Sequence, residues 1–176
     1  MPHYTNPLFY YRETVYKSSS LYMWRPMTPK DIPQVYQISL QVHSLYEDPE
    51  IFEERRSLSK GSYVLESEKV VGYLISHPYR RDTYPPLNTL IGKIPDPDTW
   101  YIHDLAILPE FRGRGMVRPV LAEVKALALA QGFRELSLVS VYGSEVFWTK
   151  MGFRLATQAN YGRLMQQKIN EPYVFI

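Results

Sequence analysis

The sequence predicts one domain of the mixed α/β (α+β) class, with about seven strands and about four helices. The strongest indication is a central unit over 100–131, in which an apolar strand enters an Arg-Gly-Arg-Gly turn and a long Ala/Leu/Val-rich helix follows. Short apolar segments bounded by turn residues flank this unit on both sides, as expected for a sheet with covering helices. A length of 176 residues without internal repeats favours a single hydrophobic core.

The first half of the chain is expected to hold a strand, two helices and a hairpin. The strand covers 21–27 and is followed by Thr28-Pro29-Lys30-Asp31, which resembles a capping box with proline at the first helical position. Apolar residues at helical spacing continue that helix: Ile32, Val35, Ile38, Val42 and Leu45. A second short helix covers 49–58, and 62–66 with 69–76 form a hairpin-like pair.

The second half is expected to begin with an irregular, proline-rich connection over 78–98, with one helical turn near 87–91. A loop of this length in a small domain is usually functional or disordered. The remaining elements are the strand 100–108, the helix 115–131 ended by Gly132, the strand 136–141, the short helix 144–150 and the closing strands 152–158 and 163–169. Residues 1–20 form an N-terminal extension to the domain 21–176, which either docks as an extra strand or stays loose.

The composition argues against several classes of function. A formal net charge of +2, with scattered tyrosines and no basic stripe, argues against nucleic-acid binding. The absence of cysteine excludes a disulfide framework, and the four histidines lack metal-ligand spacing, so no metal is expected. No apolar run approaches the roughly 18–20 residues that cross a bilayer, and 1–11 does not resemble a signal peptide. We therefore expect a cytoplasmic protein without membrane contact.

The Arg-Gly-Arg-Gly turn predicts an anion site. The start of a helix presents unpaired N–H groups and a positive dipole end. Gly113 and Gly115 allow the backbone to approach an anionic group closely, and Arg112 and Arg114 add full charges. With a strand before it and a helix after it, the turn is interpreted as a pyrophosphate cradle. The alternative is a simple exposed turn with solvated arginines.

Three segments in a fixed order carry a family resemblance: Arg25-Pro26-Met27-Thr28-Pro29-Lys30-Asp31, Leu105-Ala106-Ile107-x-Pro109-x-Phe111-Arg112-Gly113-Arg114-Gly115 and Phe147-Trp148-Thr149-Lys150-Met151-Gly152-Phe153. Together they resemble the GNAT superfamily of acyl-CoA-dependent N-acyltransferases, over about 21–169. The resemblance implies a GNAT-type, mostly antiparallel sheet that splays at its central strands. It also implies transfer of an acetyl group from acetyl-CoA to a primary amine, by direct attack in a ternary complex.

The resemblance further implies which residues hold the coenzyme. The amides of 112–117 would bind its pyrophosphate, and the backbone of Leu105 and Ile107 would pair with its pantetheine arm. The full expected set is Leu105, Ala106, Ile107, Arg112, Gly113, Arg114, Gly115, Met116, Val117 and Trp148. One departure from the family pattern is Val117, which stands where Gly or Ala is usual, and Pro119 removes an N–H just beyond it.

Catalysis requires a group that removes a proton from the attacking amine. His103 is the candidate base, because imidazole titrates near neutrality. Arylalkylamine N-acetyltransferases look similar here, with histidines at the positions of Tyr101 and His103. The alternatives are a buried structural histidine bonded to a backbone carbonyl, and Asp104 as the base. Strand alternation is expected to put Tyr101, His103 and Leu105 on one face and Asp104 on the other.

A second departure concerns the group that protonates the departing thiolate. Many relatives are assigned a tyrosine for this step at the position of Trp148, and an indole N–H is no practical proton source. Trp148 is therefore expected to pack under the coenzyme arm, and the proton to come from Tyr142, Ser144 or water. The expected catalytic set is His103, Tyr142 and Tyr101.

The acceptor is expected to be a small-molecule amine, held by the first two helices and the segment 79–90. An acidic cluster would attract a cationic amine, or would simply be a solvated helix N-terminus: Glu47, Asp48, Glu50, Glu53 and Glu54. The long proline-rich loop favours a partly covered pocket over the open groove that a protein or peptide N-acetyltransferase needs. The third possibility is a coenzyme A-binding module with little catalysis. By analogy with the family, the protein is expected to be a monomer or homodimer.

Overall fold

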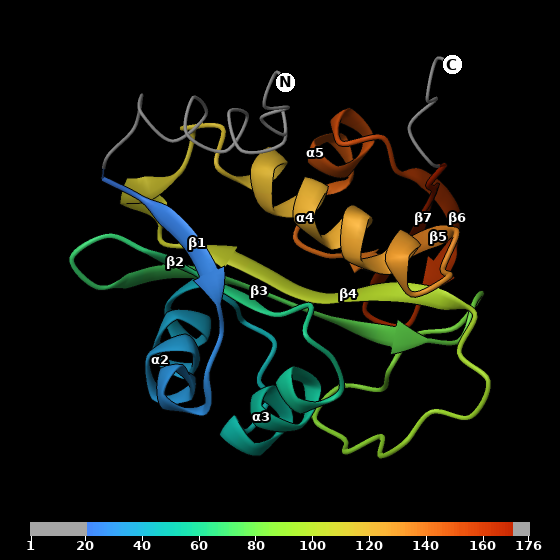
Figure 1. Ribbon diagram of the computed structural model, residues 1–176, viewed down its shortest axis with the longest axis horizontal. Helices are drawn as coiled ribbons and strands as arrows, with labels where there is room; N and C mark the ends of the chain where they lie inside the picture. The colour runs from blue at the N-terminus through green and yellow to red at the C-terminus, as the bar shows by residue number, and fades with distance from the viewer. Residues whose placement is uncertain (1–20, 171–176) are drawn as a thin grey trace, which may run out of the picture.

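The computed structural model describes residues 21–170, so the expected extension 1–20 lies outside the described residues. A seven-stranded sheet crosses the molecule in the order β1-β2-β3-β4-β5-β7-β6 (Figure 1). Its strands are β1 (Met23–Pro26), β2 (Tyr63–Glu66), β3 (Val70–Tyr79), β4 (Thr99–Ile107), β5 (Glu135–Ser140), β6 (Arg154–Ala159) and β7 (Gly162–Lys168). One face is covered by α2 (Ile32–Val42) and α3 (Pro49–Ser57), the other by α4 (Val117–Ala130) and α5 (Glu145–Lys150). The predicted fold class is confirmed, with element ends shifted by a few residues.

The sheet opens at its centre. All neighbouring strands are antiparallel except β4 and β5, which run parallel. Pairing of β4 with β5 runs only from Trp100↔Leu136 to Ile102↔Leu138, although β4 continues to Ile107. The second half of β4 therefore has no strand partner on that side, and the expected splay at the central strands is confirmed.

A β-bulge in β4 changes which side chains share a face. Ile75 of β3 pairs with Asp104 and Ser76 pairs with Ile102, so His103 is an extra residue in the ladder. An extra residue reverses the alternation of the side chains that follow it. His103 and Asp104 both contact the loop between α2 and α3, while Leu105 packs with the cluster under α4. The expectation that Asp104 lies on the face opposite His103 is wrong.

Apolar side chains fill both faces of the sheet. α2 buries Ile32, Val35 and Ile38 on one face, and α4 buries a stripe on the other: Val120, Leu121, Val124 and Ala128. In the described part of the chain, no helix is both long and apolar enough to span a bilayer.

The start of α2 is fixed by an ion-paired capping box. A short 3₁₀ turn (Pro29–Asp31) precedes the helix, and the Asp31 carboxylate accepts hydrogen bonds from the N–H and hydroxyl of Thr28 at 2.8 and 2.9 Å. The guanidinium of Arg25 in β1 bonds Asp31 at 2.8 Å and Glu66 in β2 at 2.9 Å. The predicted capping box is confirmed, and it also joins the first helix to the sheet edge.

Asp31→Asn is expected to lower the free energy of unfolding at pH 7 by about 1–2 kcal/mol. Hydrogen bonding to Arg25 lowers the pKa of Asp31 to about 2, so the charged form stabilises the folded state above the ordinary pKa of the group. The difference from wild type should shrink as the pH falls from 4 toward 2, which chemical denaturation at several pH values measures. Glu68→Gln at the exposed hairpin turn is the control. A pH-independent difference would contradict this account.

The connection between β3 and β4 has no helical turn at 87–91, contrary to the prediction. Side chains of α3 hold the backbone of this segment instead. The Arg55 guanidinium donates to the Thr89 carbonyl at 2.7 Å, and the Glu54 carboxylate accepts from the N–H groups of Ile91 and Gly92 at 3.0 and 2.8 Å. These bonds satisfy the backbone groups that a helical turn would otherwise pair.

Candidate active site

Two adjoining cavities occupy the opening beside β4. The first, of about 360 Å³, lies between the α2–α3 loop, the middle of β4 and the C-terminal end of β5. The second, of about 380 Å³, lies between the free edge of β4 and the start of α4. Four residues line both: Val42, Leu105, Arg112 and Phe147. A ligand in one cavity would therefore meet a ligand in the other at this junction.

The second cavity is lined by nine of the ten residues predicted to hold a coenzyme: Leu105, Ala106, Ile107, Arg112, Gly113, Arg114, Gly115, Met116 and Val117. Gly113 and Gly115 have φ of +73° and +71°, and a Cβ at either would face open space. No side chain caps the start of α4, so its first amides remain available to an anion, apart from Pro119, which has none. These features fit a pyrophosphate.

The position of this turn is set by contacts from outside it. Trp24 in β1 donates its indole N–H to the Met116 carbonyl at 2.7 Å. Arg112 Nε donates to the Ile107 carbonyl at 2.7 Å, and the Arg114 guanidinium lies 5.3 Å from the ring centroid of Tyr22. Neither arginine is simply solvated, and the turn is tied to both β1 and β4.

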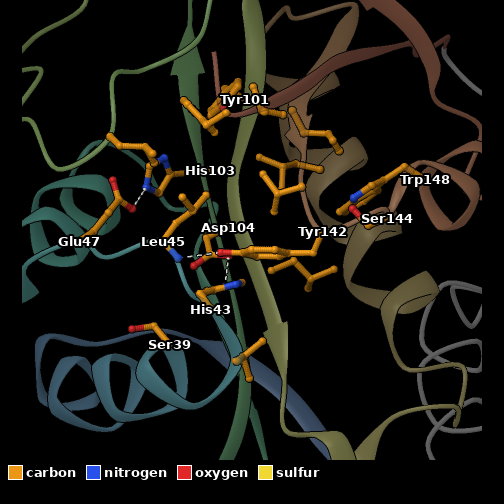
Figure 2. Close-up of a pocket in the computed structure, with 18 of the residues that line it drawn as sticks. Ser39, His43, Leu45, Glu47, Tyr101, His103, Asp104, Tyr142, Ser144 and Trp148 are labelled. Atoms are coloured by element: carbon orange, nitrogen blue, oxygen red, sulfur yellow. Dashed lines mark hydrogen bonds and ion pairs between the residues drawn. The ribbon is translucent and has the colours of Figure 1, made fainter. Parts of the chain in front are cut away.

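Two histidine–carboxylate pairs line the first cavity (Figure 2). His103 Nε2 lies 2.9 Å from Glu47 Oε2, and His43 Nε2 lies 2.8 Å from Asp104 Oδ1. Each pair joins β4 to the α2–α3 loop, and the histidine comes from the strand in one pair and from the loop in the other. The β4 bulge makes this possible, because it turns both His103 and Asp104 toward that loop.

The surroundings favour ionised carboxylates in both pairs. Burial opposes the charge on Glu47, but the hydrogen bond and charge of His103 outweigh it, so the pKa of Glu47 lies below its ordinary value. Burial likewise opposes the charge on Asp104, yet His43 and the Tyr73 hydroxyl, which donates at 2.6 Å, keep its pKa low. Burial would lower the pKa of His43, but Asp104 raises it overall.

The pairing determines which nitrogen of His103 is free. When His103 is neutral, its Nε2–H donates a hydrogen bond to the ionised Glu47 carboxylate, and the lone pair is then on Nδ1. Among the described residues, Nδ1 of His103 is buried and has no hydrogen-bond partner. His103 is therefore paired with a carboxylate side chain and not with a backbone carbonyl, and it keeps one nitrogen able to accept a proton.

Tyr142 spans the first cavity from the end of β5 to the α2–α3 loop (Figure 2). Its hydroxyl accepts hydrogen bonds from the N–H groups of Ser44 and Leu45 at 3.1 and 2.8 Å, and its ring stacks on His43 at 5.7 Å. The residue has φ of +53°, a conformation that costs energy for a side chain of this size. Since both contacts use the oxygen as acceptor, the hydroxyl proton stays available to another group.

Comparison with known families identifies the chain. Residues 24–153 match the family model described as the acetyltransferase (GNAT) family, which is well over half of the sequence. The chain belongs to the GNAT acetyltransferase family. It is an acetyl-CoA-dependent N-acetyltransferase. A sequence search finds no match among curated proteins.

Solved structures with this GNAT fold are similar over most of the chain. Ard1 from Thermoplasma volcanium is 20% identical with a TM-score of 0.69, covering 86% of this chain and 99% of that one. Arabidopsis thaliana Naa50, in complex with the bisubstrate analogue CoA-Ac-MVNAL, is 14% identical with a TM-score of 0.65 and coverage of 84% and 99%. N-acetylglutamate synthase from Neisseria gonorrhoeae, with coenzyme A and L-arginine, is 15% identical with a TM-score of 0.63, covering 86% of this chain and 34% of that one.

Tyr101 and Trp148 are both buried in this acetyltransferase. Tyr101 lies in β4 beside His103, with ring centroids 6.3 Å apart, and shares a hydrogen bond with Tyr161. Trp148 lines the first cavity and packs between Phe147 and Phe153, with ring centroids 5.0 and 5.3 Å away. Trp148 therefore does not line the second cavity with the other nine residues. It forms a packed part of the wall of the first cavity.

The five acidic residues expected to attract an amine do not form one surface. Of these, only Glu47 lines the first cavity. Asp48 bonds Tyr46 and Asn88, Glu53 bonds Arg56, and Glu54 pairs with Arg55. Asp48, Glu53 and Glu54 thus have side-chain partners of their own, and the attraction of a cationic amine by this cluster stays a prediction.

Three functional contacts went unnoticed in the sequence. Trp24 bonds the Met116 carbonyl of the Arg-Gly-Arg-Gly turn, Tyr73 bonds Asp104, and Tyr161 lines the first cavity. A buried tyrosine usually has a hydrogen-bond partner for its hydroxyl. This general rule is the only basis on which the sequence could have indicated a role for Tyr73. The partners themselves come from strand pairing and lie too far away in sequence for local patterns to indicate.

Proposed function

We propose that this acetyltransferase acetylates the primary amine of a small molecule, by direct attack within a ternary complex. The observation that supports a small-molecule acceptor is that the segment between β3 and β4 covers the first cavity. The segment between β3 and β4 contributes Leu87 to its wall and joins its two sides. On one side Asn88 bonds Glu47 and Asp48, and on the other the Tyr161 hydroxyl donates to the Pro85 carbonyl at 2.9 Å.

The cover is continuous with the β6–β7 turn as well. The Tyr84 hydroxyl accepts a hydrogen bond from the N–H of Asn160 at 2.8 Å, and its ring packs edge-on against Tyr161. A peptide passing between the α2–α3 loop and the β6–β7 turn would have to displace these contacts. An amine small enough to enter beside Leu87 would leave these contacts in place.

The charge of the first cavity favours an amine without a carboxylate. Its carboxylates, Glu47 and Asp104, are each paired with a histidine, so neither is free to bind a second cationic group. Among the described lining residues, Arg112 is the only lysine or arginine, and it already bonds the Ile107 carbonyl. This arrangement supports a monoamine with an apolar body over an amino acid.

The reaction needs a proton acceptor, a proton donor and a bound thioester. Acetyl-CoA supplies the thioester, and the residues from Arg112 to Val117 and the free edge of β4 would hold the coenzyme. His103 accepts on Nδ1 the proton that the nitrogen of the attacking neutral amine loses as the bond to the acetyl carbon forms, and the Glu47 carboxylate stabilises the imidazolium that results. Tyr142 is the candidate donor to the departing thiolate, because its hydroxyl proton is not used by its own contacts.

The competing acceptor is a peptide, in view of the analogue bound to Arabidopsis Naa50. The test is an acceptor panel of alkylamines, arylalkylamines, free amino acids and short peptides with varied N-termini. Thiol release and product mass are measured at one acetyl-CoA concentration. We expect kcat/KM to be highest for apolar monoamines. A higher value for peptides or amino acids would overturn the proposed acceptor class. Saturable acetyl-CoA binding without turnover of any acceptor would instead favour a coenzyme-binding module.

A further inference from the structure

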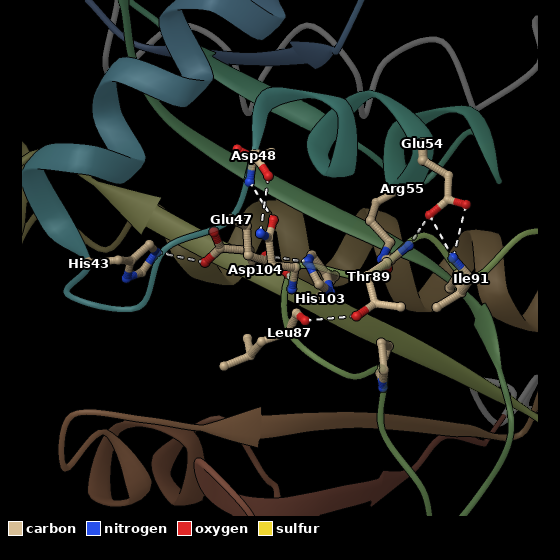
Figure 3. Close-up of polar contacts among 12 residues, drawn as sticks. His43, Glu47, Asp48, Glu54, Arg55, Leu87, Thr89, Ile91, His103 and Asp104 are labelled. Carbon is tan, nitrogen blue, oxygen red and sulfur yellow. Dashed lines mark hydrogen bonds and ion pairs between the residues drawn. The ribbon is translucent and has the colours of Figure 1, made fainter.

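Glu47 is held from two directions in the structure. Its Oε2 lies against His103 Nε2, and its Oε1 accepts the backbone N–H of Asn88 at 3.1 Å (Figure 3). The Glu47 side chain is 9% exposed, and these are its two hydrogen bonds among the described residues. Asn88 thus holds Oε1 of Glu47, while Oε2 of the same carboxylate pairs with His103.

The side chain of Asn88 fixes the orientation of its own backbone. Oδ1 accepts the N–H of Asp48 at 2.7 Å, and Nδ2 donates to Asp48 Oδ2 at 3.0 Å. The residue has φ of +47°, a region in which asparagine is one of the few common non-glycine residues. Asn88 therefore clamps Asp48, the neighbour of Glu47, and points its N–H at the Glu47 carboxylate.

The segment that carries Asn88 is itself anchored to α3. The Arg55 side chain is fully buried and donates to the Thr89 carbonyl, and Glu54 binds the N–H groups of Ile91 and Gly92 (Figure 3). A buried guanidinium with a fixed carbonyl partner is costly to displace. Asn88 is consequently held in a segment that α3 anchors. It directly follows Leu87, which lines the first cavity.

We propose that Asn88 is a positioning residue for the acetyl transfer, acting through Glu47 to set the orientation and protonated nitrogen of His103. Without the clamp, Glu47 is free to turn away, and His103 loses the partner that holds the proton on Nε2 and leaves Nδ1 free. This inference rests on the proposed role of His103 as the base. Asn88 itself need not touch either substrate.

Several titratable and charged groups surround His103, so its ionisation does not depend on Glu47 alone. They come from the α2–α3 loop, from β3 and β4, from α3 and from the β6–β7 turn: Glu47, His43, His77, Tyr79, Tyr101, Asp104, Arg55 and Tyr161. Removing the clamp changes only the first of these contacts. The acid limb of the kcat/KM profile should therefore move to lower pH in Asn88→Ala, because the imidazolium loses part of its carboxylate stabilisation.

A double-mutant cycle between Asn88→Ala and Glu47→Gln tests the proposal. Asn88→Ala alone should lower kcat about tenfold, with the acetyl-CoA dissociation constant unchanged. In the Glu47→Gln background the same change should have almost no effect, since the clamp then has no carboxylate to position. Both variants keep the backbone N–H that bonds Glu47, but only glycine adopts the positive φ without strain, so Asn88→Gly should lose less than Asn88→Ala. Thr89→Ala removes a contact within the same segment, to the Leu87 carbonyl, and should retain wild-type kcat.

Additive effects of Asn88→Ala and Glu47→Gln would overturn the proposal, because they would show a general loosening of the segment. A second readout does not depend on activity. The imidazole ¹⁵N chemical shifts of His103, assigned with His103→Gln, report which nitrogen is protonated. We expect a proton on Nε2 in the wild type and a mixture in Asn88→Ala, and identical shifts would contradict the clamp. If His103→Ala retains full kcat, the base assignment fails, whereas additivity in the cycle alone removes only the role of Asn88.

Discussion

Replacing Gly113 and Gly115 together with glutamate is expected to abolish saturable acetyl-CoA binding. Both glycines have positive φ, which an L side chain adopts only with strain. A side chain at either position would also occupy the open space beside the uncapped start of α4. Two added carboxylates would repel the pyrophosphate that we propose binds at this turn. Calorimetry should show micromolar binding by the wild type and an affinity at least about 100-fold weaker in the variant.

Gly132→Glu is the matched control for this experiment. Gly132 also has positive φ and open space at its Cβ position, but it lies after the C-terminal end of α4, away from the cradle. Its replacement should lower the melting temperature without changing acetyl-CoA affinity. Undiminished binding by the Gly113→Glu/Gly115→Glu variant would show that the coenzyme uses another surface.

His103→Ala is expected to lower kcat by about 10²–10⁴, the usual contribution of a positioned general base. The acetyl-CoA dissociation constant should change by less than about twofold, because His103 lines the first cavity and not the cradle. Steady-state kinetics with the best acceptor and calorimetry with acetyl-CoA separate the two effects. Equal losses in kcat and coenzyme affinity would instead indicate that the substitution disturbs the whole opening beside β4.

The cradle could be predicted from the sequence because its determinants are local. The strand, the two glycines, the two arginines and the helix follow one another within 105–130, and each has a direct physical reason to be there. The capping box at Thr28 and Asp31 is local in the same sense. The order of strands and helices also followed from apolar patterning and turn residues, apart from the helical turn expected at 87–91, which the structure lacks.

The arrangement around His103 could not be predicted in this way. The bulge depends on how β3 pairs with β4. A prediction that assumed strict alternation of side chains along β4 therefore placed Asp104 on the wrong face. Both histidine–carboxylate pairs join residues far apart in sequence, by 56 positions for His103 and Glu47 and by 61 for His43 and Asp104. Glu47 looked like one of several acidic residues at a helix start. Only tertiary packing distinguishes it from Asp48, Glu53 and Glu54.

The pH dependence of kcat/KM, measured in parallel for wild type and His103→Ala with one small amine, tests the central claim most directly. The account predicts that the wild-type profile falls on the acid side through two ionisations, those of the acceptor amine and of His103. The variant should retain only the ionisation of the amine. Superimposable profile shapes for the two proteins would contradict the assignment of His103 as the group that takes the proton.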